Sequence, residues 1–178
     1  WGKIPLIRNW NFTSEEHMGF YHFSNFTGKI STTGDDVPTI LQNTSFRNLF
    51  DDFGATDNSD YGNISNWNTK GVIEFRSMFF GQSLFNHDVS NFDFSSAKGF
   101  SGVRTIFANC TNFNNGQASG ESTAPLTIDC GKSTALDGLF QSCSSFNQPV
   151  TFKNTSNVTT MSSMFYNATN FNQSVSNF

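Results

Sequence analysis

The chain of 178 residues has little charge, few aliphatic residues and no long apolar segment. Charged side chains make up only 13% of it, about half the share of a typical soluble domain. The net charge of −4 provides neither the basic footprint of a nucleic-acid-binding protein nor a polybasic patch for anionic lipids. No run of about 18 apolar residues is present. We therefore expect no nucleic-acid partner and no direct insertion into a membrane.

The sequence also lacks an initiating methionine and a visible signal peptide. It begins at Trp1, so we expect a processed or excised piece of a longer chain. Cysteine is scarce, with Cys110, Cys130 and Cys143, and an odd number cannot all pair within one chain. Buried free thiols are one interpretation. A disulfide between Cys110 and Cys143 is another, because both occupy the same place in a repeat.

Phenylalanine, in contrast, occurs 22 times. A compact core normally mixes several aliphatic residue types, so a core of one type suggests one structural position copied many times. Four stretches align, and each has a Phe after an aliphatic residue and a Phe-Asn pair six residues later. The stretches are 78–92, 106–114, 139–150 and 164–178.

An aliphatic marker extends this pattern upstream and gives a unit of about 25 residues, with longer steps where inserts occur at 32–38 and 114–125. The marker residues are Ile7, Ile30, Ile64, Val89, Leu126, Val150 and Val175. Residues 1–178 are therefore expected to form a single repeat domain. Its copies are degenerate over 1–50 and clearer over 51–178.

The repeat predicts one short helix and one short strand per unit. Apolar residues at i, i+3, i+6 and i+7 mark helices of two to three turns over 72–79, 100–107 and 158–165. Strands are expected over 89–94 and 150–152. The predicted fold is an α/β repeat solenoid, a leucine-rich-repeat-like stack of short parallel strands and short helices.

The Asn of each Phe-Asn pair has a structural interpretation. A side-chain amide offers two donors and an acceptor, so Asn at one repeated position can bridge successive coils. The expected ladder consists of Asn86, Asn114, Asn147 and Asn172.

The last copy, MFYNATNFNQSVSNF preceded by SNVTTMSS, resembles the bacterial surface protein repeat of about 26 residues. This repeat is abundant in mycoplasma-type surface lipoproteins and in some Gram-positive wall proteins. It is similar to the surface leucine-rich repeats of oral anaerobes and mucosal protozoa. The resemblance implies a surface-exposed, non-enzymatic solenoid that mediates adhesion to host or neighbouring cells. Residues 1–50 match this pattern poorly, and Phe92 and Phe178 replace its usual Trp.

Chemical sites are weakly indicated. Asp51, Asp52, Asp57 and Asp60 form a carboxylate cluster that is a candidate for Ca²⁺. It departs from the EF-hand pattern, so a solvated loop is the alternative. His17 and His22 follow no common metal motif. His87 lies beside Asp88 without a nucleophile at a motif spacing. We expect no cofactor and no catalysis.

Asn-X-Ser/Thr sequons are frequent and would be glycosylated only in an organism that glycosylates. They begin at Asn11, Asn25, Asn43, Asn63, Asn109, Asn154, Asn157, Asn167 and Asn172.

Two functions remain open. The first is an extracellular or cell-surface module that binds a protein or glycan of another cell. Trp67, Phe92 and Phe94 are its possible surface contacts, with a place in the core as their alternative. The second is a structural subunit that assembles with copies of itself, end to end, into a filament, sheath or surface layer.

Overall fold

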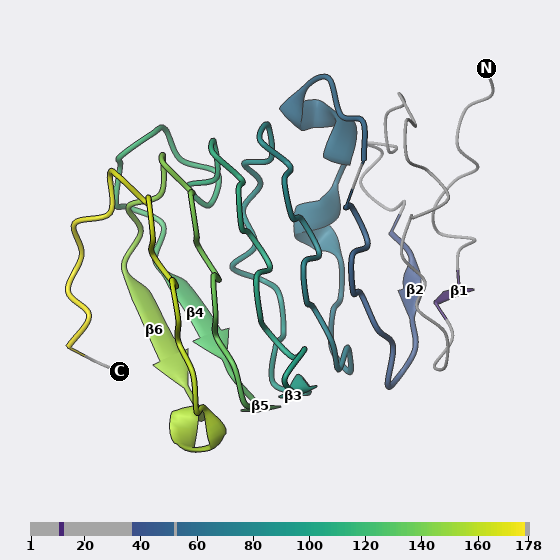
Figure 1. The fold of residues 1–178 in the computed structure, drawn as a ribbon. Coiled ribbons are helices and arrows are strands. Elements are labelled where there is room, and N and C mark those ends of the chain that lie inside the picture. The colour runs from purple at the N-terminus through teal and green to yellow at the C-terminus, as the bar shows by residue number, and fades with distance from the viewer. Residues whose placement is uncertain (1–10, 13–36, 52, 177–178) are drawn as a thin grey trace.

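The computed structural model describes residues 11–12, 37–51 and 53–176. In Figure 1 the backbone runs back and forth, and successive stretches of the described chain lie side by side from β2 (Thr39–Ile40) to the stretch that follows β6 (Val150–Lys153). The described residues contain short strands and short 3-10 helices but no α-helix. The elements are β1 (Asn11–Phe12), β2 (Thr39–Ile40), η3 (Asn58–Tyr61), η4 (Ile64–Asn66), β3 (Lys98–Gly99), β4 (Leu126–Asp129), β5 (Lys132–Ser133), β6 (Val150–Lys153) and η5 (Thr155–Asn157).

All paired strands in the described part of the chain are parallel. β1 pairs with β2, β3 with β5, and β4 with β6. The longest pairing aligns Leu126 with Val150 and Asp129 with Lys153. The strand predicted over 150–152 lies within β6, whereas residues 89–94 contain a turn at 90–91 and no strand.

Five further stretches of backbone, here called rows A to E, hydrogen-bond to one another in sequence order. They are residues 43–50, 71–83, 98–112, 132–145 and 159–170. Alternate N–H groups of one row donate to carbonyls of the next, for example Phe75 to Gly102 at 2.7 Å and Phe79 to Ile106 at 3.0 Å. The N–H groups between them close turns within the row, as Met78 does to Phe75. Most backbone donors of the rows are therefore paired without a helix.

The prediction of short helices over 72–79, 100–107 and 158–165 is wrong, because these segments consist largely of turns. A residue near the middle of each has positive φ, at 55° for Ser77, 50° for Thr105 and 56° for Ser163. Such a residue cannot continue a right-handed helix. Each turn returns the chain to the core side after three or four residues, and this spacing imitates the apolar period of a helix.

Two columns of stacked Phe rings form the centre of the core. Neighbouring rings within the first column lie 5.2 to 5.8 Å apart between centroids, nearly parallel. Rings of the two columns stack on each other at 3.9 to 4.2 Å. Each such contact stabilises the fold by about 0.5–1.5 kcal/mol beyond the contribution from burying the ring. The columns are Phe50, Phe79, Phe107, Phe140 and Phe165, and Phe85, Phe113, Phe146 and Phe171.

Beside the second column, the Asn residues form a ladder of side-chain-to-backbone hydrogen bonds. The Asn86 amide oxygen accepts the N–H of Asn114 at 2.8 Å, 28 residues later. The Asn114 oxygen accepts the N–H of Asn147 after 33 residues, and the Asn147 oxygen that of Asn172 after 25, each at 2.9 Å. Asn58 extends the ladder upstream by accepting the N–H of Asn86 at 2.7 Å.

The same amides attach the insert at 114–125 to the rows. Asn114 Nδ2 donates to the carbonyls of Ala118 and Glu121, and Asn147 Nδ2 donates to that of Gly120 at 2.7 Å. The insert therefore keeps its backbone carbonyls paired although it has no regular structure of its own.

The ladder makes a first prediction. Asn114 is fully buried. Asn114→Ala therefore leaves the N–H of Asn147 and the carbonyls of Ala118 and Glu121 without their hydrogen-bond partner. We expect the free energy of unfolding to fall by about 2–4 kcal/mol. The control is Asn172→Ala, because Asn172 is exposed and uses only its backbone N–H in the ladder; a change within about 0.5 kcal/mol is expected. Urea unfolding measures both, and equal losses would contradict the ladder.

The turn conformation makes a second prediction. Ser163 is exposed with a φ of 56°, a conformation that glycine adopts without steric cost. Ser163→Gly should therefore raise the free energy of unfolding by about 0.5–1 kcal/mol. Its neighbour Ser162 is also exposed but is not among the positive-φ residues. Ser162→Gly should lower stability by a similar amount, and a change of the same sign in both variants would exclude the turn.

Candidate functional site

The aromatic residues proposed as surface contacts lie in the core, so that prediction is wrong. Trp67 and Phe94 are each 1% exposed and Phe92 is 6% exposed. Phe94 packs edge-on against Phe75, with ring centroids 4.8 Å apart. The segments that connect consecutive rows are here called the return segments. The three aromatic residues fill the space between the return segments and the rows and cannot contact a partner.

Two members of the acidic cluster, Asp57 and Asp60, accept backbone N–H groups. Asp60 accepts the N–H groups of Thr56 and Asp57, and Asp57 accepts that of Ser59, which together form a capping box at η3. No group of His, Cys, Asp or Glu suited to a metal occurs among the described residues. Asp52 lies outside them, as do His17 and His22.

The considered Cys110–Cys143 bridge is not formed, since both residues are free thiols. The Cys110 and Cys143 S–H groups donate to the carbonyls of Phe79 and Phe107, each at 2.9 Å. Burial raises the pKa of both thiols well above the ordinary value. Burial, with a smaller contribution from Asp129, raises the pKa of Cys130 to about 11. All three thiols are therefore protonated and unreactive at neutral pH.

His87 has a structural environment. Its ring Nε2 lies 2.8 Å from the Asn58 carbonyl, and the ring packs near those of Tyr61 and Phe85. Burial lowers the pKa of the His87 imidazole below 6.5, and its hydrogen bond to Asn58 partly opposes this. His87 is thus neutral at pH 7 and holds the return segment against the second Phe column.

The sequons differ in exposure. Asn43, Asn154, Asn157, Asn167 and Asn172 are exposed, while Asn63 and Asn109 are half-buried. Asn25 and the side chain of Asn11 lie outside the described part.

The outward side of the rows, here called the row face, is the first surface suited to binding. Two positions define it, the third residue before each Phe of the first column and the first residue after it. The former are Arg47, Arg76, Arg104, Asp137 and Ser162, and the latter Asp51, Phe80, Ala108, Gln141 and Tyr166. Phe80 and Tyr166 are 39% and 60% exposed. Ala108 of row C is buried, whereas the other positions carry charged, amide, hydroxyl or aromatic side chains.

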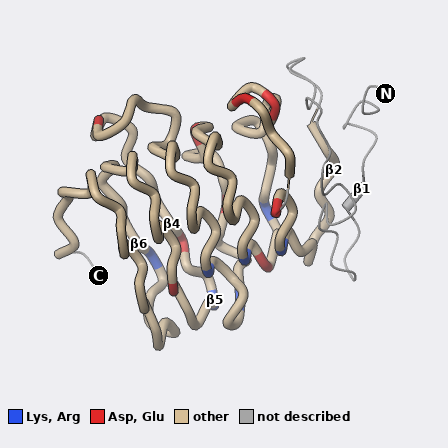
Figure 2. Tube along the Cα trace, turned by 45° about the horizontal axis from the view of Figure 1, so that its top comes forward, with Lys and Arg blue, Asp and Glu red and all other residues tan. Residues whose placement is uncertain are grey.

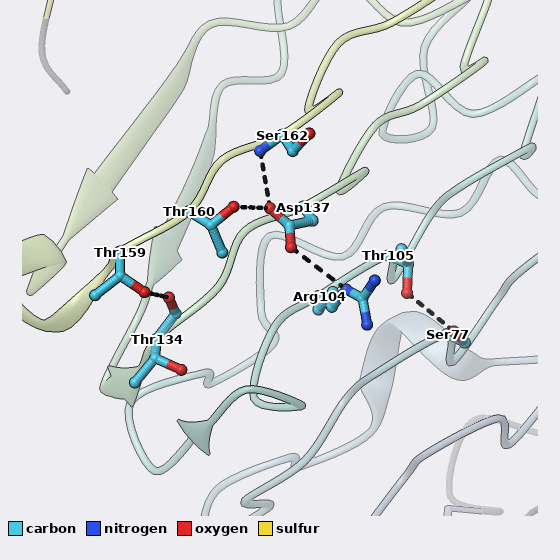
Figure 3. A network of polar contacts seen from close by, with 8 residues as sticks. All are labelled: Ser77, Arg104, Thr105, Thr134, Asp137, Thr159, Thr160 and Ser162. Carbon is cyan, nitrogen blue, oxygen red and sulfur yellow. Dashed lines mark hydrogen bonds and ion pairs between the residues drawn. The ribbon is translucent and has the colours of Figure 1, made fainter.

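Polar contacts fix the side chains of the row face across rows (Figure 3). Asp137 accepts the hydroxyl of Thr160 at 2.6 Å and the N–H of Ser162 at 2.8 Å. Its other oxygen lies 3.6 Å from Nε of Arg104, whose guanidinium also covers the exposed ring of Phe100 at 4.3 Å. These contacts hold the surface groups of rows C, D and E in defined positions.

A second feature lies where the rows begin. Lys70 precedes Gly71 as Lys98 precedes Gly99, and Lys98 is the register partner of Lys132 in the β3–β5 pair. All three lysines are exposed, and they are here called the lysine column. In Figure 2 the basic residues follow the lower edge of the trace with a few acidic ones among them, whereas the upper loops carry acidic residues.

A shallow groove of about 260 Å³ runs beside the lysine column. Its polar lining comes from the start of row A, from rows C and D and from the turn before row C: Gln42, Asn43, Ser95, Ser96, Lys98 and Lys132. Next to Lys132, the chain at Gly131 passes close to the lining residues Ser95 and Ala97. A Cβ there would lie 2.5 Å from the Ala97 carbonyl oxygen and 2.7 Å from that of Ser95.

Both basic columns were unpredicted, although the sequence carries a signal for them. Arg stands three residues before the stacked Phe in three copies, and Lys stands next to Gly at the same corner of three copies. Once the Phe positions are aligned, the Arg column follows directly, whereas Lys132 is offset by one residue from Lys70 and Lys98.

Comparison with known proteins gives one result. The family model described as "Mycoplasma protein of unknown function, DUF285" matches residues 20–127 and 125–178. Neither the curated proteins nor the solved structures include a match. No helix in the described residues is long and apolar enough to cross a membrane.

The environment of His87 makes a prediction about pH. The folded-state pKa of His87 lies below the unfolded value of 6.5. Just below pH 6.5, the unfolded chain is therefore protonated at His87 to a greater extent than the folded chain. The contribution of His87 to the free energy of unfolding is therefore fully present above about pH 6.5, and it falls as the pH drops below that value. His87→Gln, which introduces the residue of the equivalent positions 148 and 173, should remove this part of the decline. Urea unfolding between pH 5 and 8 measures it, and identical pH profiles would contradict the assignment.

Proposed function

This chain belongs to the DUF285 family of Mycoplasma proteins, and we propose that it is a repeat solenoid that recognises a partner outside the cell without catalysing a reaction. The repetition supports the solenoid. Ladder residues recur after 28, 33 and 25 residues, and each copy stacks its rings on those of the next. These intervals also support the finer identification with the bacterial surface protein repeat of about 26 residues. The coils are closed by turns in place of the helices of a leucine-rich repeat.

The row face is the observation that carries recognition. Stacking successive coils produces an extended surface on which equivalent side chains recur at the spacing of the rows. Phe80 and Tyr166 supply exposed aromatic groups, and Arg104 and Asp137 supply charges fixed by neighbouring rows. Exposed aromatic and Arg side chains are the residue types that dominate binding energy at protein interfaces.

A place outside the cell is supported by the composition. Only 13% of residues are charged, and the polar surface consists mainly of amide and hydroxyl side chains, which suit contact with proteins and glycans of another cell. All three thiols are buried, so exposure to an oxidising medium leaves them intact.

The proposal predicts saturable binding of the labelled chain to cultured animal epithelial cells, measured by flow cytometry. Phe80→Ser with Tyr166→Ser should weaken this binding by about tenfold or more, because both rings leave the row face. The matched control is Leu41→Ser with Val175→Ser, since Leu41 and Val175 are 44% and 49% exposed but lie outside the row face. Absence of saturable binding, or equal loss in both double variants, would reject recognition by this surface.

Row E supports a second candidate, the assembly of copies end to end. Met161 and Tyr166 of this row are 39% and 60% exposed, and a row of a second copy could pack on them and pair with the backbone. Light scattering of the same sample separates the two candidates. A mass of 19.8 kDa at every concentration contradicts assembly, whereas a mass that grows with concentration supports it.

A further inference from the structure

We infer that the groove beside the lysine column binds an acidic polysaccharide through its sulfate or carboxylate groups. The inference rests on the proposed recognition function and names the chemistry of the partner. Its starting point is the pair Lys98 and Lys132, which are register partners in adjacent parallel strands and are both exposed. Among the described residues neither lysine forms an ion pair. Two ammonium groups held side by side repel each other, and an anion placed between them removes that repulsion.

The acidic residues nearest in sequence to the groove lining accept hydrogen bonds within the fold. Glu74, which follows the lining residue Ile73, accepts the hydroxyl of Ser45 at 2.6 Å. Asp93 accepts the N–H of Ser95 at 2.9 Å, and Asp129 accepts the N–H of Gly131 at 2.9 Å and the amide of Asn154 at 2.8 Å. These carboxylates stabilise the turns that build the groove. The groove lining itself contains two cations and no acidic side chain, so its electrostatic preference is for an anion.

The remaining lining fits a sugar. Gln42, Asn43, Ser95 and Ser96 contribute amide and hydroxyl groups, which match the donors and acceptors of sugar hydroxyls. A volume of about 260 Å³ is below the roughly 300–1,000 Å³ of pockets for drug-sized ligands. The groove therefore accommodates one ring or one charged substituent of a longer chain.

A peptide fits this groove less well. An extended peptide binds by pairing with free backbone groups at a sheet edge. Here the N–H of Lys98 already donates to Ile73, and that of Lys132 donates to Ala97, at 3.0 and 2.7 Å. The backbone donors of these two groove residues are thus used within the fold, and the side chains remain for recognition.

The repeat extends the site along the molecule. Lys70 lies three residues before Ile73, whose carbonyl accepts the N–H of Lys98. Arg47, Arg76 and Arg104 form a column on the row face. A linear polymer with anionic groups on successive units can contact several rows at once. Such multivalent contact converts individually weak ion pairs into measurable affinity, which salt will reduce.

Isothermal titration calorimetry of the whole chain at low salt tests the inference, with heparin, hyaluronan and neutral dextran as probes. Heparin carries sulfate and carboxylate groups and hyaluronan carries carboxylates alone. Binding to either, without binding to dextran, is expected. Lys98→Gln and Lys132→Gln should each weaken it, and the double variant should do so by about tenfold or more. Lys153→Gln removes an exposed lysine outside the groove and should leave the affinity unchanged.

Failure of both acidic polymers to bind overturns the inference, as does equal weakening by Lys98→Gln and Lys153→Gln. Polyglutamate that binds as tightly as heparin, with the same loss in the groove variants, also overturns it in favour of an acidic peptide. The cell-binding assay separates this from the proposed function. If the chain binds cells but no acidic polymer, only the inference fails, whereas polymer binding without cell binding rejects the proposed function alone.

Discussion

The structure depends on keeping each row in register with the next. The N–H groups that donate across rows and the Phe rings that stack across rows must meet their partners at the same time. A shift by one residue would move the rings out of their columns and break the Asn ladder. The hydrogen bonds and the ring contacts thus select the same single alignment of the rows. Because both require it, the fold is specific although no row is stable alone. The intervals between ladder residues are 28, 33 and 25 residues. The register therefore tolerates inserts that lie in the segments between rows.

The sequence predicted the features that depend on identical residues at identical positions. The Phe-Asn spacing located both ring columns and four members of the Asn ladder, because the same side chain performs the same role in each copy. It predicted helices wrongly, since turns that point inward every three or four residues have nearly the period of a helix. Only the positive φ of residues such as Ser77 and Thr105 distinguishes the two, and Ser and Thr give no warning of it. For Trp67 the sequence left a surface contact and a core position open, and the ring lies in the core.

The surface is the part that varies between copies, and this explains why it was hardest to predict. The core positions hold Phe in row after row, whereas the outward position holds Arg in rows A to C, Asp in row D and Ser in row E. Such a scaffold can change its binding chemistry without changing its register. The row face, the lysine column and the groove beside it are therefore where the function of this chain is expected to lie, while the thiols, His87 and the η3 carboxylates serve the fold.

The row register can be tested most directly by cross-linking across rows B and C. The hydroxyls of Ser77 and Thr105 lie 2.9 Å apart, so Ser77→Cys with Thr105→Cys places two thiols within disulfide reach. On mild oxidation of the folded chain, mass spectrometry of its peptides should find this bond, while the native thiols stay buried. The offset pair Ser77→Cys with Asn109→Cys, four residues further along row C, should remain reduced. A bond in the offset pair, or its absence from the aligned pair, would contradict the register and the fold built on it.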